Sequence, residues 1–348
     1  MSSKRRGQDN QSQSHGKRSR PAPAPKKHLY LIDPDTLLAA SGDGSTCTDQ
    51  DPEEHLPEPA AFRFVAPAPA SGTKFVAIGS NIVIVSGETE APTLVYDTEA
   101  AALAICPPLP VRLSGLDLAV ASGDALYALT TLGAGLPLAF EALSWARCTR
   151  DAEEPGRPTH EWSWKSVATQ PPPFGNEDDG DTVVISYAAH PDGRTISVCT
   201  RRGNTNGSTY SLDTTTRREW RCHGSWVLPF RGQGYFDREL DAWVSLHEEK
   251  GYICACQVAS RSGTATAPPD SDKLEEKLFL TLTYVGDSRF CLVESVGVKT
   301  GYGCVGRVTT FGLKFNRKGK LQITSHCAAN SYLVSKHVSS FYPVAFWM

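Results

Sequence analysis

Short apolar runs alternate with turn residues along the chain from His28 onward. The runs are four to seven residues long, are rich in Val, Ile, Tyr, Phe and Trp, and are separated by Gly, Asp, Asn or Pro. Runs of this length between turn residues are typical of β-strands joined by hairpins. No stretch of twelve residues has a clean apolar period of 3.6, so we expect no long helices.

Six segments share the form of a strand, a tight turn and a second strand. The turns at 79–81, 122–124 and 191–193 each contain a glycine, and a further central turn lies near residue 249. Unequal spacing of the turns indicates surface insertions between repeats. The six predicted hairpins cover residues 75–85, 116–129, 184–198, 242–256, 278–293 and 311–323.

A second hairpin unit follows three of these segments. Residues 93–110 and 209–229 each contain a strand, an Asp-Thr turn, another strand and a closing Leu-Pro, and 140–174 is a looser copy with a charged insertion. An inner and an outer hairpin together make one four-stranded propeller blade. The chain therefore predicts an all-β fold, a β-propeller of six irregular four-stranded blades over residues 28–348. Residues 28–66 begin with the strand 28–32, and we expect C-terminal strands within 331–347 to close this partial blade.

The basic N-terminal segment contrasts with the rest of the chain. Residues 1–27 carry eight Lys and Arg residues against Asp9, whereas the remainder carries 27 bases and 37 acids. The segment has almost no apolar side chains, so we expect a disordered tail. An acidic body is a poor surface for nucleic acid, which leaves nucleic-acid binding through the tail as an alternative.

Two basic clusters in the tail match the spacing of a bipartite nuclear-import signal. They predict an import receptor as a partner and a nuclear or nucleocytoplasmic location. The alternative is a solvated basic tail that is not a targeting signal. No apolar run is long enough for a membrane span, and no secretory signal core is found, so we expect an intracellular protein with no membrane partner. The import residues are Lys4, Arg5, Arg6, Lys17, Arg18 and Arg20.

The cysteines favour structural roles. They are scattered along the chain, as small, mostly buried, reduced thiols of an intracellular protein would be. Cys254 and Cys256 point to one face of a strand, but no second pair follows at a zinc-binding spacing. We therefore expect no metal and no cofactor. The ten cysteines are Cys47, Cys106, Cys148, Cys199, Cys222, Cys254, Cys256, Cys291, Cys304 and Cys327.

Motifs for catalysis are not found, since the chain has no phosphate-binding Gly-rich loop and no nucleophile elbow. The acidic run 177–181 lacks the ligand spacing of a calcium loop and is expected to be a solvated loop. We therefore expect no enzyme activity. Five tryptophans are expected to pack between blades, where large flat side chains bury the most area: Trp162, Trp164, Trp220, Trp226 and Trp243.

Segment 231–241 concentrates polar side chains in a predicted connection between two blades. Loops held by a rigid scaffold are common recognition sites. The alternative is a connection whose charges pair among themselves. The candidate partner-binding residues are Arg231, Gln233, Tyr235, Asp237, Arg238 and Glu239.

The unit of a strand, a Tyr-Asp-Thr turn, a strand and Pro-Leu-Pro resembles kelch and F-box-associated propeller repeats. Residues 209–220 with 226–243 look more like an uncharacterised kelch-like plant family expanded in grasses. The Gly-Gly pair of a kelch strand is absent, with 85–87 in its place, and we expect no F-box because residues 1–27 are too polar to form one. The resemblance implies a propeller that binds proteins and catalyses no reaction. The alternative is a propeller enzyme, or a protein that binds a small ligand or carbohydrate, acting at the central channel.

Overall fold

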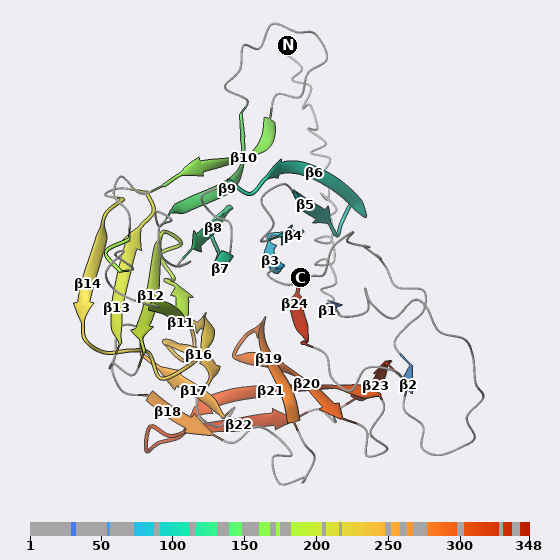
Figure 1. Ribbon diagram of the computed structural model, residues 1–348. Helices are drawn as coiled ribbons and strands as arrows, with labels where there is room; N and C mark the ends of the chain where they lie inside the picture. The colour runs from blue at the N-terminus through green and yellow to red at the C-terminus, as the bar shows by residue number, and fades with distance from the viewer. Residues whose placement is uncertain are drawn as a thin grey trace, which may run out of the picture.

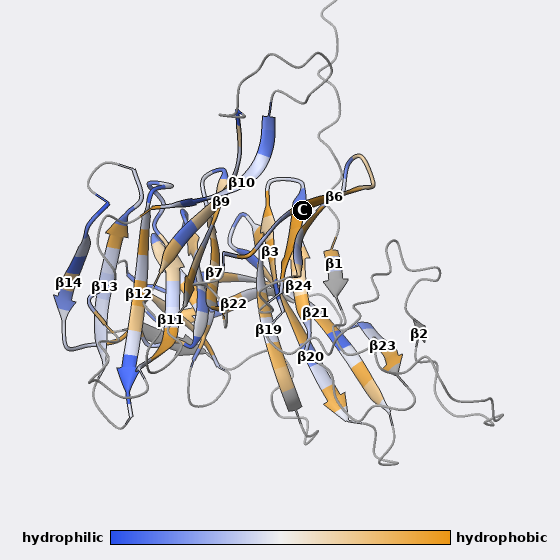
Figure 2. Cartoon of the chain, turned by 45° about the horizontal axis from the view of Figure 1, so that its top comes forward, coloured by the Kyte–Doolittle hydropathy of each residue, from blue (hydrophilic) through white to orange (hydrophobic). Residues whose placement is uncertain are grey.

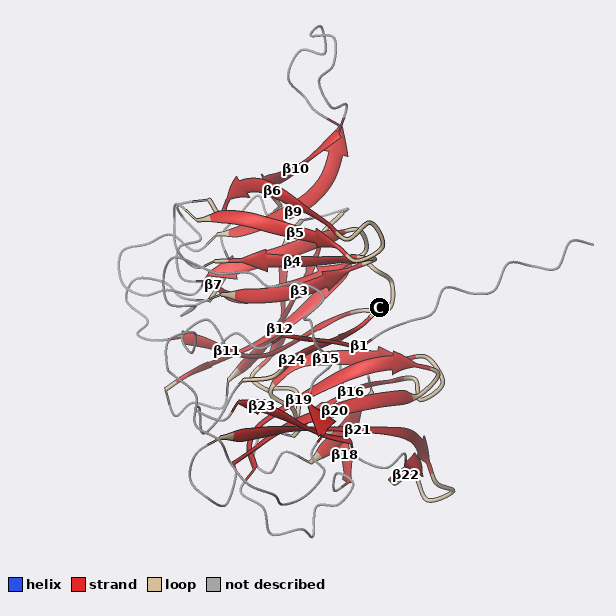
Figure 3. Cartoon of the chain, turned by 90° about the vertical axis from the view of Figure 1, so that its right-hand side faces the viewer, coloured by secondary structure: helices blue, strands red, loops and turns tan. Residues whose placement is uncertain are grey.

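The computed structural model describes part of the chain, and its regular elements there are all β-strands, numbered β1 to β24 (Figure 3). The predicted all-β class is therefore confirmed. The described residues are 29–32, 54–55, 73–86, 91–110, 116–130, 139–147, 160–167, 172–174, 182–203, 207–215, 218–247, 252–257, 263–266, 277–297, 303–326, 330–335 and 342–348.

Most strands belong to consecutive groups of four, each an antiparallel meander in chain order. The first group consists of β3 (Lys74–Ile78), β4 (Asn81–Val85), β5 (Pro92–Asp97) and β6 (Ala102–Pro108). The second consists of β7 (Leu116–Ser122), β8 (Ala125–Thr130), β9 (Phe140–Arg147) and β10 (His160–Ser166). The third consists of β11 (Thr182–Ala189), β12 (Thr195–Arg202), β13 (Ser208–Asp213) and β14 (Trp220–Gly224).

The two later groups have additional pairings. The fourth consists of β15 (Gly232–Asp237), β16 (Ala242–Leu246), β17 (Ile253–Cys256) and β18 (Gly263–Thr266). Its first strand also pairs in parallel with β11, which joins the third and fourth groups into one eight-stranded sheet. The fifth consists of β19 (Lys277–Gly286), β20 (Arg289–Gly297), β21 (Cys304–Phe315) and β22 (Leu321–His326). The long β21 also pairs with β23 (Asn330–Ser335), and β23 pairs with β2 (Glu54–His55).

The two ends of the described chain close the ring. Strand β1 (Leu29–Ile32) pairs antiparallel with β24 (Val344–Trp347), with Leu29 opposite Trp347. The prediction that an N-terminal strand would pair with a C-terminal one is confirmed. This closing pair has two strands within the described residues, so six four-stranded blades remain a prediction.

The sheets are arranged around a common centre, with β3, β7, β11, β19 and β24 nearest to it (Figure 1). This radial arrangement is that of a β-propeller. The inner strands carry long apolar stretches, whereas the outer strands β10 and β14 are mainly hydrophilic (Figure 2). The predicted fold class is confirmed in this form.

Hydrophobic clusters fill the spaces between neighbouring sheets. In β4, Val83 and Val85 face the second blade, whereas Ile82 and Ile84 face the closing pair β1–β24. Burial on both faces explains why β4 is an almost continuous apolar run without a polar alternation.

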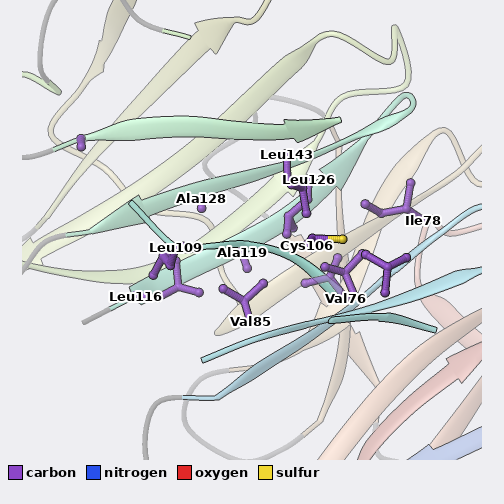
Figure 4. Close-up of a cluster of buried hydrophobic side chains, with 13 residues drawn as sticks. Val76, Ile78, Val85, Cys106, Leu109, Leu116, Ala119, Leu126, Ala128 and Leu143 are labelled. Atoms are coloured by element: carbon purple, nitrogen blue, oxygen red, sulfur yellow. The ribbon is translucent and has the colours of Figure 1, made fainter. Parts of the chain in front are cut away.

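The cluster between the first two blades shows this packing in detail (Figure 4). Val76 and Val85 of the first blade meet Leu116, Leu126 and Leu143 of the second, and all five are buried. Burying each such side chain stabilises the fold by about 1.5–3 kcal/mol relative to leaving it exposed. The five tryptophans predicted to pack between blades all belong to or contact such clusters: Trp162, Trp164, Trp220, Trp226 and Trp243.

Glycines form several of the predicted hairpin turns. Gly79, Gly123 and Gly193 have φ values of 57°, 58° and 70°, a left-handed conformation that side chains with a Cβ adopt at a cost. In the fourth blade the predicted inner hairpin is wrong by one strand. The turn predicted near residue 249 connects the second and third strands of the blade, β16 and β17. The turn between the first and second strands, which is equivalent to the turns at Gly79, Gly123 and Gly193, is formed by residues 238–241.

Candidate functional site

Turns from three successive blades surround one surface depression of about 440 Å³. Pro191 comes from the β11–β12 turn of the third blade, and Tyr284 and Asp287 come from the β19–β20 hairpin of the fifth. Between them, the end of β15 contributes Phe236, and the turn after it contributes Arg238 and Glu239. In each blade, these residues lie in or beside the turn that connects the first strand to the second. The lining residues are close together because these turns occupy equivalent positions in neighbouring blades.

A buried carboxylate ties the fourth blade to the fifth beneath this depression. Asp237 is 0% exposed. Its Oδ1 accepts hydrogen bonds from the Leu240 backbone N–H at 2.8 Å and from the Ser288 hydroxyl at 2.8 Å, and its Oδ2 accepts one from the Ser288 backbone N–H at 3.0 Å. A buried carboxylate needs several such donors to offset its lost hydration. Asp237 thereby holds the turn of its own blade and that of the next.

The β19–β20 turn has an unusual backbone. Asp287 and Ser288 have φ values of 52° and 53°, and together they form a two-residue hairpin turn in which both residues are left-handed. Asn-Gly or Asp-Gly usually occupies such turns, because a Cβ is disfavoured in this conformation. The hydrogen bonds that Ser288 donates to Asp237 stabilise the turn, and the Ser288 hydroxyl oxygen also lies 3.0 Å from Glu239 Oε2.

Tyr284 lies beside this network, and the negative charges of the network affect the pKa of its phenol. Burial raises the pKa of the Tyr284 phenol to about 12, with further contributions from the charge and hydrogen bond of Asp237 and the charges of Asp287 and Glu239. The phenol therefore remains protonated at neutral pH and can donate a hydrogen bond to a carboxylate. Its ring packs on Phe290 with centroids 5.2 Å apart.

The β11–β12 turn is rigid for a different reason. Asp192 Oδ1 accepts hydrogen bonds from the backbone N–H groups of Arg194 and Thr195, each at 2.9 Å. Partial burial tends to raise the pKa of Asp192, but these bonds, the Thr195 hydroxyl and the charge of His190 together lower it. The His190 ring also lies edge-on to the Trp243 ring, with ring centroids 6.5 Å apart. These contacts fix the position at which Pro191 is presented.

The predicted connection between blades has a different structure from the one expected. Residues 232–237 form β15, the first strand of the fourth blade, and do not form a loop. Gly232 and Gly234 resembled loop residues, but they allow β15 to lie against β11 in parallel register. Only the turn that follows, with Arg238 and Glu239, is a loop.

The structure divides the candidate partner-binding residues into two groups. Arg238 and Glu239 line the depression, and Asp237 lies buried beneath it. Arg231, Gln233 and Tyr235 do not line it; burial raises the pKa of Tyr235, which packs among apolar side chains between the fourth and fifth blades. Sequence reasoning missed Pro191, Phe236, Tyr284 and Asp287, and the equivalence of the first turns in each blade is the signal that leads to them.

Other candidates lie outside the described residues or away from the depression. The import residues Lys4, Arg5, Arg6, Lys17, Arg18 and Arg20, and the acidic run 177–181, fall outside the described ranges. Nowhere in those ranges do three or more His, Cys, Asp or Glu side chains gather as metal ligands would. The described part of the chain also holds no helical segment that could cross a lipid bilayer.

The described cysteines are free thiols, and most are buried as expected. Cys254 and Cys256 lie between the third and fourth blades, and burial raises the pKa of each to about 12. Cys222 is the exception among the described cysteines, since it is exposed on the outer strand β14. Cys47, Cys148 and Cys327 lie outside the described residues.

Three solved structures are distantly similar to this chain. A variant of AofleA from Arthrobotrys oligospora is 11% identical, with a TM-score of 0.37 over 79% of this chain and 89% of that one. A puromycin-hydrolyzing peptidase from Mycobacterium tuberculosis is 13% identical, with a TM-score of 0.37 over 73% of this chain and 44% of that one. An endo-arabinase from Bacteroides thetaiotaomicron is 12% identical, with a TM-score of 0.30 over 79% of this chain and 92% of that one. Scores this low carry no argument about function.

Comparison with protein families is more informative. No curated protein matches the chain significantly. Neither a kelch nor an F-box family is among the matches, so that resemblance is not supported beyond the propeller fold. One family model covers residues 17–332, which is most of the sequence. The chain belongs to the family described as "Protein of unknown function (DUF1668)".

Proposed function

We propose that this propeller is a non-enzymatic protein-interaction module that holds its partner at the depression between the third, fourth and fifth blades. The observation that carries the proposal is the convergence of three rigid turns around a depression of about 440 Å³. Its volume falls within the range of about 300–1,000 Å³ that is typical of ligand sites. The lining combines the aromatic residues Phe236 and Tyr284 with charged side chains, a mixture found at recognition surfaces.

The state of the titratable groups favours binding over catalysis. The Asp237 carboxylate is occupied by hydrogen bonds that hold two turns together, and it lies beneath the surface. A general base needs a pKa near the working pH, whereas the pKa of Tyr284 is raised to about 12. The Asp237 carboxylate and the Tyr284 phenol are therefore better suited to holding the turns in place and to contacting a bound partner than to transferring protons.

Quantitative affinity purification from cells tests this function. The full chain is compared with the double variant Arg238→Ala/Glu239→Ala, which changes two exposed side chains at the depression. Arg218→Ala/Glu219→Ala is the matched control, because it removes the same exposed pair of residue types from the β13–β14 turn. We expect a reproducible set of co-purifying proteins to fall at least threefold with the first variant and to be unchanged with the control. An identical set from all three chains would contradict the proposal.

We also propose that the basic clusters in 4–20 direct the protein to the nucleus through an import receptor. The support is the charge contrast between residues 1–27 and the rest of the chain. A fluorescent fusion carrying Lys17→Ala, Arg18→Ala and Arg20→Ala should lose nuclear accumulation. Lys26→Ala/Lys27→Ala, outside the two clusters, should retain it. Unchanged nuclear accumulation in the first fusion would overturn the import signal.

A further inference from the structure

We propose that the depression between the third, fourth and fifth blades binds a lysine or arginine side chain of a partner protein. This inference rests on the interaction function proposed above and names the chemistry that the partner must present.

Carboxylates outnumber guanidinium groups in and beside the depression. Glu239 and Asp287 line it, and Asp237 lies buried beneath. Arg238 is the cation among the lining residues, and the guanidinium of Arg289 lies 3.9 Å from the Asp287 carboxylate. The Arg289 and Asp287 side chains are 61% and 88% exposed, so their ion pair contributes little and can exchange for a ligand cation.

One of these carboxylates has a hydrogen-bond partner within the site. The Ser288 hydroxyl shares its one proton between Asp237 Oδ1 at 2.8 Å and Glu239 Oε2 at 3.0 Å. A pre-positioned acceptor loses less conformational entropy when it binds a cationic group. Hydrogen bonds between a carboxylate and an ammonium or guanidinium group are stronger than neutral ones.

Aromatic and apolar surfaces complete the site. Phe236 and Tyr284 line the depression beside the carboxylates, and Pro191 borders it from the neighbouring blade. Aromatic ring faces attract cations, and the methylene stem of lysine or arginine is suited to contact with apolar surface. The three charges that raise the pKa of Tyr284 all belong to carboxylates, which indicates a negative potential at this ring. An acidic or phosphorylated side chain would be repelled there.

The test uses the full chain and a displayed library of random twelve-residue peptides, followed by fluorescence anisotropy with synthetic peptides. Selection should recover peptides that share a lysine or arginine at one position. Replacing that residue by norleucine, which keeps an unbranched stem without the charge, should weaken binding about tenfold.

A charge-neutralised variant locates the interaction. Glu239→Gln/Asp287→Asn should weaken the lysine peptide about tenfold and leave its norleucine form unaffected. Asp124→Asn/Glu219→Gln neutralises two exposed carboxylates elsewhere and should change neither affinity. Thermal unfolding monitored by circular dichroism verifies that every variant is folded.

The possible failures can be distinguished. Selected peptides that lose affinity with Arg238→Ala/Glu239→Ala but share no basic residue, or share an acidic one, would overturn the basic ligand and leave the interaction function standing. Failure to select any peptide, or affinities unchanged in every depression variant, would overturn both.

Discussion

Gly234 offers a sharp test of the packing that positions the depression. A Cβ added at Gly234 would lie 2.5 Å from Cζ and 2.9 Å from Cε2 of Phe230. Favourable carbon–carbon contacts are about 3.5–4.0 Å long, so the ring or the strand must move by about 1 Å. Phe230 is 1% exposed and packs among Ala188, Leu228 and Trp243, which leaves its ring little space.

We expect Gly234→Ala to destabilise the protein by about 1–3 kcal/mol, the usual cost of overpacking a filled core. Strand β15 carries Gly234 opposite Ala188 of β11 and leads directly to Asp237. The movement should therefore also weaken binding of peptides at the depression. Urea unfolding followed by tryptophan fluorescence measures the free energy, and peptide anisotropy measures the second effect.

A double-mutant cycle identifies the cause of the destabilisation. Phe230→Leu removes the ring atoms that clash with the new Cβ, so the cost of Gly234→Ala should be at least 1 kcal/mol smaller in the Phe230→Leu background. A cost below about 0.5 kcal/mol for Gly234→Ala alone, or the same cost in both backgrounds, would refute the proposed contact.

Three further predictions concern other parts of the structure. Ser288→Ala removes the hydroxyl that binds Asp237 and Glu239, so it should cost about 1–3 kcal/mol in urea unfolding, whereas no measurable change would contradict the network. The pKa of Asp192 is lowered in the folded state. The ionised Asp192 therefore stabilises the folded protein above the unfolded-state pKa, and this contribution is lost as pH falls through the folded-state pKa. Asp192→Asn should reduce the loss of stability on acidification, and identical pH profiles would count against this. Peptide-mapped alkylation of the native protein should label exposed Cys222 long before Cys254 or Cys256, whose pKa values are raised to about 12; equal rates would show that these thiols are accessible.

The sequence was a good guide to three of the local hairpin turns and to the closing pair of strands. Gly79, Gly123 and Gly193 are flanked by apolar runs, and all three form the turns predicted from them. The closing pair was also predictable, because the strands that contain Tyr30 and Phe346 lie at opposite ends of a repeat-built chain.

Non-local contacts explain what sequence reasoning missed. Gly232 and Gly234 resemble loop residues until β11 is placed beside them. The partnership of Asp237 with Ser288 spans 51 residues, and no pattern within either segment indicates it. The depression requires three segments from three blades, so only two of its lining residues, Arg238 and Glu239, were among the predicted candidates.

Hydrogen–deuterium exchange of the full chain, with and without a selected basic peptide, shows where on the propeller the peptide binds. We expect slower exchange in residues 190–194, 236–241 and 284–288 when the peptide is added, and no such protection in Glu239→Gln/Asp287→Asn. Protection confined to other blades, with these three segments unchanged, would contradict binding at the depression.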